Sequence, residues 1–317
     1  MDSKKIYSAF CNNNDDIPLF HKPWWLDIMT ENNWDVAIST ENNGAIKAAM
    51  PYMIKRRFGN PIMVQPNLTP FLGVLFFYPP DIAKRTSIYS FQNKHLSSII
   101  ENLPEDLIYQ YSKFLPEFDN WLPFYHNGYE QSVRYTYIID DIKDHDKVYN
   151  DFTNTIKRQI KDAEDKVKIT HEDNLCLVFA MVKESIEKQG LKFGLKREVM
   201  KALEKKLLEL NKTKIFIARD KNGNATSGVF LVWDKRKAYL LGLGTSQNYS
   251  NNNSTKLLIW ESIKYVSQFV DKYDFEGSML PGVERLYRSF GGKRTQYYEL
   301  KKYKNKYYKA IFALLNK

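Results

Sequence analysis

Residues 274–292, DFEGSMLPGVERLYRSFGG, form the stretch that decides the fold of this 317-residue chain. The apolar pattern leading into it predicts a strand over 273–276 that ends in the carboxylate of Glu276. The spacing after it predicts a helix over 283–290, which the two closing glycines would end. The remaining elements are placed outward from this strand and this helix.

Four side chains in this stretch are candidates for chemistry. Glu276 can face a cleft and act as the general base for an amine, although a strand-end carboxylate can equally pair with a surface lysine. Tyr287 lies one position off the apolar helix face, so it can protonate a leaving group or simply flank the core. Arg285 and Arg288 are three residues apart and can hold a phosphate, or form a solvated basic face.

Upstream of this stretch, the chain alternates like neighbouring strands and then continues as a helix. The expected strands are 214–219, 227–233 and 238–243, and the expected helix is 254–270. Strands that are joined through a helix indicate a mixed sheet with helices packed on it.

The junction between strand 238–243 and the helix from Ser254 is a candidate donor site. A helix N-terminus offers unpaired N–H groups and a positive dipole end, which suit a pyrophosphate. An ordinary capped helix after a polar loop would give the same pattern. The candidate binding residues are Leu243, Thr245, Asn253, Ser254, Thr255 and Lys256.

A charged helix is expected over 151–165, with a basic ridge beside its apolar stripe. Arg158 and Lys161 on this ridge are candidate substrate-binding residues, and a solvated amphipathic helix is the alternative. Two further helices are expected over 175–189 and 196–210.

The first half of the chain reads as short strands with a few helices. We expect helices over 23–29 and 88–100, and strands over 34–40, 45–50, 59–64, 107–114 and 133–139. Residues 140–147 are polar and are the best candidate for a linker. The expected domains are therefore 1–145 and 146–317.

Charge differs between these halves. Residues 1–145 hold 13 Lys and Arg against 17 Asp and Glu, whereas residues 146–317 hold 34 against 20. A basic half attracts phosphates, nucleic acid or anionic lipid, or it only keeps the surface soluble. The chain has no transmembrane stretch and no apolar N-terminal signal, and its two cysteines fit a cytoplasmic protein.

The sequence lacks the motifs of metal-binding, hydrolase and nucleotide-binding sites. The five histidines show no metal-binding spacing, so no metal is expected. The hydrolase GxSxG, the phosphate-loop GxxxxGK[ST] and the dinucleotide GxGxxG patterns are all missing from the sequence.

Taken in order, these segments resemble the C-terminal half of Fem-like proteins of the GNAT (N-acetyltransferase) superfamily. The phrases that carry the resemblance are 239–244, 253–263, 274–278 and 284–292, together with the basic helix that holds Arg158 and Lys161. The resemblance implies an α/β (α+β) fold of two GNAT-like domains in tandem, each a mixed twisted sheet flanked by helices. The N-terminal domain would be the degenerate one.

The resemblance also implies an N-acyltransferase that moves an acyl or aminoacyl group to a primary amine. Acyl-CoA and aminoacyl-tRNA both stay open as donors, because residues 247–253 depart from the usual glycine-containing acetyl-CoA loop. The acceptor would be a small molecule or a peptidoglycan precursor. The alternative is a catalytically inactive GNAT-fold protein that binds polyanions or nucleic acid.

Overall fold

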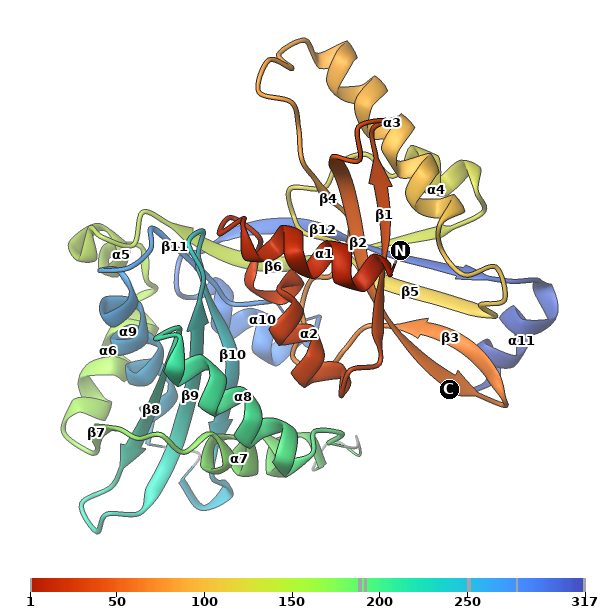
Figure 1. Cartoon of the computed structure of the whole chain (residues 1–317). Helices are drawn as coiled ribbons and strands as arrows, with labels where there is room; N and C mark the ends of the chain where they lie inside the picture. The colour runs from red at the N-terminus through yellow and green to blue at the C-terminus, as the bar shows by residue number, and fades with distance from the viewer. Residues whose placement is uncertain (1, 188–189, 191–192, 250–251, 278, 316–317) are drawn as a thin grey trace. The chain divides into compact units, whose positions relative to one another are not determined.

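The computed structural model describes residues 2–187, 190, 193–249, 252–277 and 279–315, and these form two compact units (Figure 1). Residues 1–134 and 296–317 make up unit 1, and residues 135–295 make up unit 2. These units differ from the expected division at residues 145 and 146, because the chain returns to unit 1 at Gln296. The expected linker 140–147 is in fact the end of one strand, a short connection and the start of a helix.

Unit 1 contains a sheet in the order β1-β2-β3-β5-β12. Its pairs are antiparallel except for β3 and β5, which run parallel, and β4 pairs separately with β2. Its elements are α1 (Ser3–Asn12), η1 (Leu19–His21), α2 (Pro23–Thr30), β1 (Trp34–Thr40), β2 (Ile46–Arg57), β3 (Asn60–Val64), β4 (Leu75–Phe76), α3 (Arg85–Glu101), β5 (Tyr109–Lys113), α4 (Leu122–His126), most of β12 (Lys293–Tyr303) and α11 (Lys306–Leu315).

Unit 2 contains a sheet in the order β6-β11-β10-β9-β8-β7, in which only β10 and β11 run parallel. Helix α9 connects these two parallel strands, as a crossover helix must. The elements are β6 (Glu130–Asp140), α5 (His145–Asp151), α6 (Asn154–Glu164), β7 (Lys168–His171), α7 (Leu175–Glu187), α8 (Arg197–Glu209), β8 (Thr213–Arg219), β9 (Ala225–Trp233), β10 (Ala238–Thr245), η2 (Gln247–Tyr249), α9 (Ser254–Val266), β11 (Lys272–Asp274) and α10 (Pro281–Arg288).

The two units repeat one architecture. In each, an antiparallel meander is followed by a helical crossover, a parallel strand and an antiparallel strand beside it. In unit 1 the last of these strands is β12, which follows unit 2 in sequence, and in unit 2 it is β6, which follows unit 1. The expected mixed α/β fold of two related domains in tandem is therefore confirmed.

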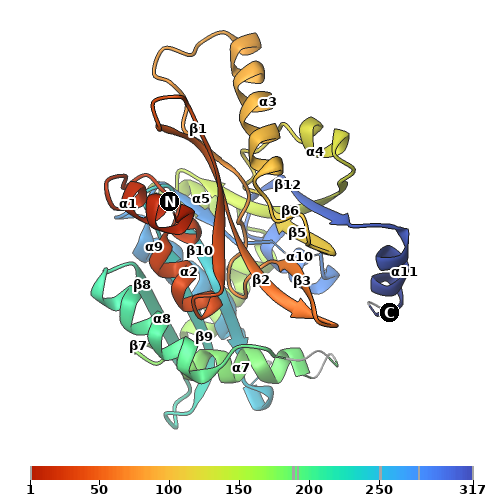
Figure 2. The same cartoon turned by 45° about the vertical axis from the view of Figure 1, so that its right-hand side comes forward.

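Helices cover both faces of the sheet in unit 2 (Figures 1 and 2). Alternate residues of β9 point to opposite faces, as the pleat of a strand requires. Leu231 and Trp233 join a core with Ile259 and Ile263 of α9, whereas the ring of Phe230 lies 5.8 Å from that of Phe179 in α7. Helix α7 packs so closely that a Cβ at Gly244 would come within 2.6 Å of Met181.

A few elements differ from those expected. The helix expected over 151–165 is α6, which begins only at Asn154 because Phe152 is extended and Thr153 caps the helix by accepting a hydrogen bond from the amide of Ile156. Helix α9 ends at Val266, before the expected residue 270. Residues 188–189 of the expected helix 175–189 lie outside the described residues, and α1, β7 and α11 were not expected.

Candidate active site

The parallel strands β10 and β11 place Leu243, Thr245 and Glu276 at or just beyond their carboxyl ends. Their pairing covers only two positions and ends where Tyr239 faces Asp274. Strand β10 continues for six residues to Thr245, about 20 Å of extended chain, without β11 beside it. A bulge between Leu240 and Gly242 bends β10 at the start of this free segment. Backbone groups on this side of β10 are therefore not bonded to β11.

Glu276 lies just beyond β11, in a tight turn. Its φ is +61° and that of Gly277 is +71°, both in the left-handed region. The backbone amide of Glu276 donates a 2.9 Å hydrogen bond to Asp274, which holds the turn closed. A Cβ at Gly277 would lie 2.0 Å from the carbonyl oxygen of Tyr135, so only glycine fits there. Ser278, the last residue of the quoted phrase, lies outside the described residues.

Asp274 anchors this turn from inside the unit. Its side chain is fully buried and accepts hydrogen bonds from Thr136 Oγ1 at 2.5 Å and from Lys237 Nζ at 2.9 Å. Lys237 is 5% exposed, so the two form a buried ion pair. The sequence analysis considered a lysine pair for Glu276 at the surface, whereas the pair that the structure shows is the buried one of Asp274. Lys237 itself was missed, because one lysine after a polar turn looks like any solvated lysine.

Glu276 and Tyr287 come together from different elements. Burial raises the pKa of Tyr287, and the negative charge of Glu276 raises it further. The phenol is therefore protonated at neutral pH and has a proton to give. Its ring packs 4.9 Å from that of Phe275, and only 7% of Tyr287 is exposed. Although Tyr287 lies one position off the apolar helix face, it is part of the core.

The N-terminus of α9 begins after an asparagine-rich loop, whose residues 250–251 lie outside the described ranges. Asn253 has a φ of +59° and makes no capping bond with its own side chain, but the side chain of Asn252 accepts a 3.1 Å hydrogen bond from the amide of Ser254. The hydroxyl of Ser254 is buried and bonds Asn252 and Ser227 at 2.5 and 2.7 Å, so it serves the fold. Thr255 and Lys256 are half-buried in the first turn, and burial lowers the pKa of Lys256.

Leu243 and Thr245 lie on the free end of β10 and are both half-buried. Their backbone belongs to the segment that β11 does not cover. The segment leads through residues 246–253 into the N-terminus of α9.

Helix α6 contacts the residue before α9 through the side chain of Asp162. Asp162 accepts hydrogen bonds of 2.8 Å from both Asn253 Nδ2 and Lys166 Nζ. These bonds from Lys166 and Asn253 lower the pKa of Asp162, and the charge of Arg158 contributes as well. Arg158 therefore lies close to the candidate donor site, with an exposed side chain. Lys161 is exposed on the same helix.

The two arginines of α10 are exposed. Arg288 Nε donates a 3.0 Å hydrogen bond to Glu284, which also accepts a 2.5 Å bond from the hydroxyl of Tyr137. The bond from Tyr137 is the main cause that lowers the pKa of Glu284, and the charges of Arg288 and Arg285 add to it. Arg288 therefore already has an anionic partner within its own helix.

Neither a metal centre nor a membrane span emerges from the residues that the structure describes. Within these ranges no cluster of three or more His, Cys, Asp or Glu side chains could hold a metal ion. No helix there combines the length and apolar character that crossing a bilayer requires.

Comparison with solved structures identifies the fold. FemX superposes with a TM-score of 0.64 at 12% identity, over 94% of this chain and 96% of FemX. L-PGS from Bacillus licheniformis superposes with a TM-score of 0.52 at 11% identity, over 92% of this chain and 89% of L-PGS. A tandem GNAT protein from the clavulanic acid biosynthesis pathway also has a TM-score of 0.52, at 10% identity, over 92% of this chain and 96% of that protein. No family model and no curated protein matches the sequence.

The class that these likenesses and the repeated architecture define is the tandem GNAT fold. Within that class the chain has the Fem-like form, shared along nearly its whole length with FemX. At these identities the likeness establishes the fold alone.

Proposed function

We propose that this chain is an N-acyltransferase that moves an acyl or aminoacyl group from acyl-CoA or aminoacyl-tRNA to a primary amine. The observation that carries the proposal is the influence of the negative charge of Glu276 on the buried, protonated Tyr287. An acceptor that is a cytoplasmic small molecule or a peptidoglycan precursor fits this chemistry. The fold shared with FemX, L-PGS and a tandem GNAT protein supports it.

The transfer needs one base and one acid. Glu276 takes a proton from the acceptor amine, whose nitrogen then forms a bond to the acyl carbon. The bond from that carbon to the leaving sulfur of CoA, or to the ribose oxygen of tRNA, breaks, and Tyr287 protonates the leaving atom. Backbone N–H groups along the free segment of β10 stabilise the negative charge on the acyl oxygen.

The donor phosphates would bind at the N-terminus of α9. The amides of Ser254 and Lys256 are bonded to Asn252 and Asn253, so the positive end of the helix dipole and the charge of Lys256 would be the main attraction for phosphate there. Arg158 lies on the neighbouring α6, close enough to Asp162 to influence its pKa. Lys161, Arg285 and Arg288 are exposed cations that could extend this surface toward a polyanionic donor such as tRNA.

Unit 1 would then be the degenerate copy. Two residues after β11 stands Glu276, whereas two residues after the corresponding β5 stands Leu115, which is buried. A leucine cannot act as a base, so only unit 2 carries the proposed acid and base.

Calorimetric titration with CoA and acetyl-CoA at moderate salt is the first test. One saturable site would identify acyl-CoA as the donor, and transfer to amine acceptors would be measured next. Without CoA binding, charged tRNA is the donor to test. Binding of polyanions with no transfer from either donor would contradict the proposal and favour a catalytically inactive binder.

The residue roles are tested by Glu276→Gln and Tyr287→Phe, each expected to lower turnover about 100-fold or more. Glu164→Gln and Tyr307→Phe, both at exposed positions, serve as matched controls. Full activity in both active-site variants would contradict the assignment.

A further inference from the structure

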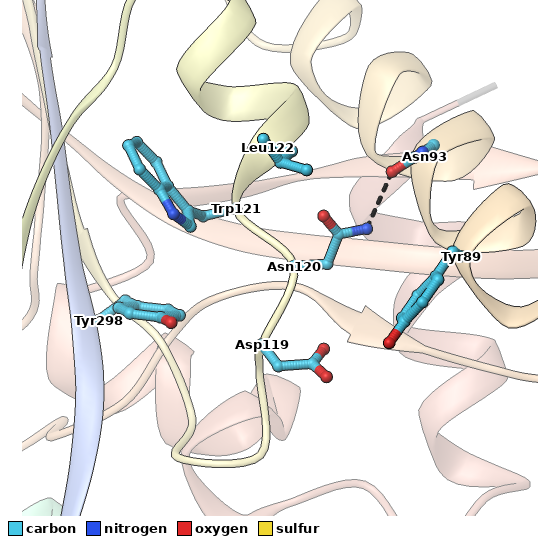
Figure 3. A pocket seen from close by; sticks show the side chains of 7 residues that line it. All are labelled: Tyr89, Asn93, Asp119, Asn120, Trp121, Leu122 and Tyr298. Carbon is cyan, nitrogen blue, oxygen red and sulfur yellow. Dashed lines mark hydrogen bonds between the residues drawn. The ribbon is translucent and has the colours of Figure 1, made fainter. Parts of the chain in front are cut away.

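Unit 1 contains a cavity of about 400 Å³ that the proposed reaction does not use (Figure 3). It lies among α3, the segment that leads into α4, and β12. Three aromatic side chains line it, namely Tyr89, Trp121 and Tyr298. The exposed side chain of Leu122 adds an apolar edge. Such walls suit the carbon skeleton of a small organic molecule.

The charge of the lining is negative. Asp119 is the only charged residue among those that line the cavity, and its carboxylate lies between Tyr89 and Tyr298 in Figure 3. Asp119 is exposed, and the structure shows no ion pair or hydrogen bond between it and another described residue. The carboxylate of Asp119 therefore favours a cation over an anion in this cavity.

Asn120 provides a second hydrogen-bond acceptor in the cavity, in addition to the carboxylate of Asp119. Its amide Nδ2 donates to Gln92 Oε1 at 3.1 Å and to Asn93 Oδ1 at 2.9 Å, which uses both of its hydrogens. Gln92 is itself fixed by a 2.9 Å bond to Tyr78. The oxygen of Asn120 is thus the atom left for a ligand, and it can only accept.

Aromatic walls, a carboxylate and a fixed amide oxygen together specify a ligand that is cationic and donates hydrogen bonds. We propose that this cavity is a binding site for an alkylammonium group. The aromatic rings and Leu122 would contact the methylene groups and the charge, and Asp119 and Asn120 would accept the N–H bonds. A quaternary ammonium lacks these N–H groups, and a neutral alcohol lacks the charge, so both should bind less well.

The proposal is tested by titrating the full-length chain with n-butylammonium and following binding by calorimetry. Because the cavity is open to solvent, we expect a dissociation constant on the order of 1 mM. Asp119→Asn keeps the size of the side chain and removes its charge, and should weaken binding at least tenfold. Glu117→Gln removes an equal charge two residues away, outside the lining, and should bind like the unmodified chain.

Several results would overturn the proposal. These are no saturable binding, equal binding by Asp119→Asn, or tighter binding of 1-butanol or glucose than of the amine. Thermal unfolding of each variant confirms that it is folded. Glu276→Gln separates this proposal from the proposed transferase function. This variant should bind n-butylammonium as tightly as the unmodified chain does, even if it no longer transfers an acyl group.

Discussion

Lys237 and Asp274 form an ion pair of 2.9 Å in which the side chains are 5% and 0% exposed. The carboxylate of Asp274 also accepts a hydrogen bond from the backbone amide of Glu276. A buried charge therefore fixes the turn that carries the proposed base. Two sequence positions that look unrelated thus determine the backbone at the candidate site.

Removing one member of this pair should destabilise the chain. Lys237→Met leaves Asp274 buried without its cation, and the expected loss in the free energy of unfolding is about 3–5 kcal/mol. The matched control is Lys272→Met, which breaks a Lys–Asp pair with half-exposed side chains to Asp140. That loss should stay below about 1 kcal/mol. Urea denaturation measures both, and equal losses would contradict the anchoring role of Asp274.

Gly277→Ala should destabilise unit 2 by more than about 1 kcal/mol, because φ is positive and the new Cβ would overlap the carbonyl of Tyr135. Gly282→Ala is the control, since a Cβ there has no neighbour within 4 Å and the residue lies in α10. It should be neutral or slightly stabilising. Thermal unfolding of the two variants distinguishes them, and a tolerated alanine at 277 would argue against the tight turn.

Low pH should lower the stability of unit 1, because it protonates the side chain of Glu299. Burial opposes ionisation of this carboxyl, but bonds from Tyr111, Arg134 and Ser132 outweigh it and lower its pKa. A carboxyl with a lowered folded pKa stabilises the fold above its unfolded pKa of about 4.3, and this contribution disappears as pH falls through the folded pKa. Glu299→Gln should therefore cost stability at pH 7 and much less at pH 3. A cost that does not change with pH would contradict this.

Lys256→Met should weaken donor binding about tenfold or more, since a charged contact to a phosphate would be lost. Lys264→Met in the same helix is the control, because that lysine is paired with Glu261 and lies far from the helix N-terminus. Calorimetry with whichever donor binds gives the comparison. Equal affinities for the two variants would remove Lys256 from the donor site.

Much of the fold could be predicted from local pattern. Alternating apolar residues located β8, β9 and β10, whereas the left-handed turn at Glu276 falls where a strand was expected. The partners of β6 and β12 could not be predicted in this way. Their pairing joins segments far apart in sequence, and a strand's own pattern indicates which face is buried but not which strand lies beside it.

The candidate site could be predicted only in part. Glu276 and Tyr287 were recognisable as residue types at suggestive positions, and the structure brings them into electrostatic contact. The burial of Tyr287 was not foreseen, because helical spacing alone ignores Phe275, against which the ring packs. Ser254 looked free to bind phosphate, yet its hydroxyl is used by Asn252 and Ser227, which no helix pattern reveals.

The exchange of β6 and β12 between the units has a consequence for synthesis on the ribosome. Unit 1 lacks its last strand until residues 296–303 have been made, and these follow the whole of unit 2 in the chain. Until then the edge of β5 stays open while the whole of unit 2 emerges. Unit 1, whose N-terminal part is synthesised first, should therefore finish folding after unit 2. Nascent chains stalled before residue 296 should remain sensitive to proteases in their N-terminal part.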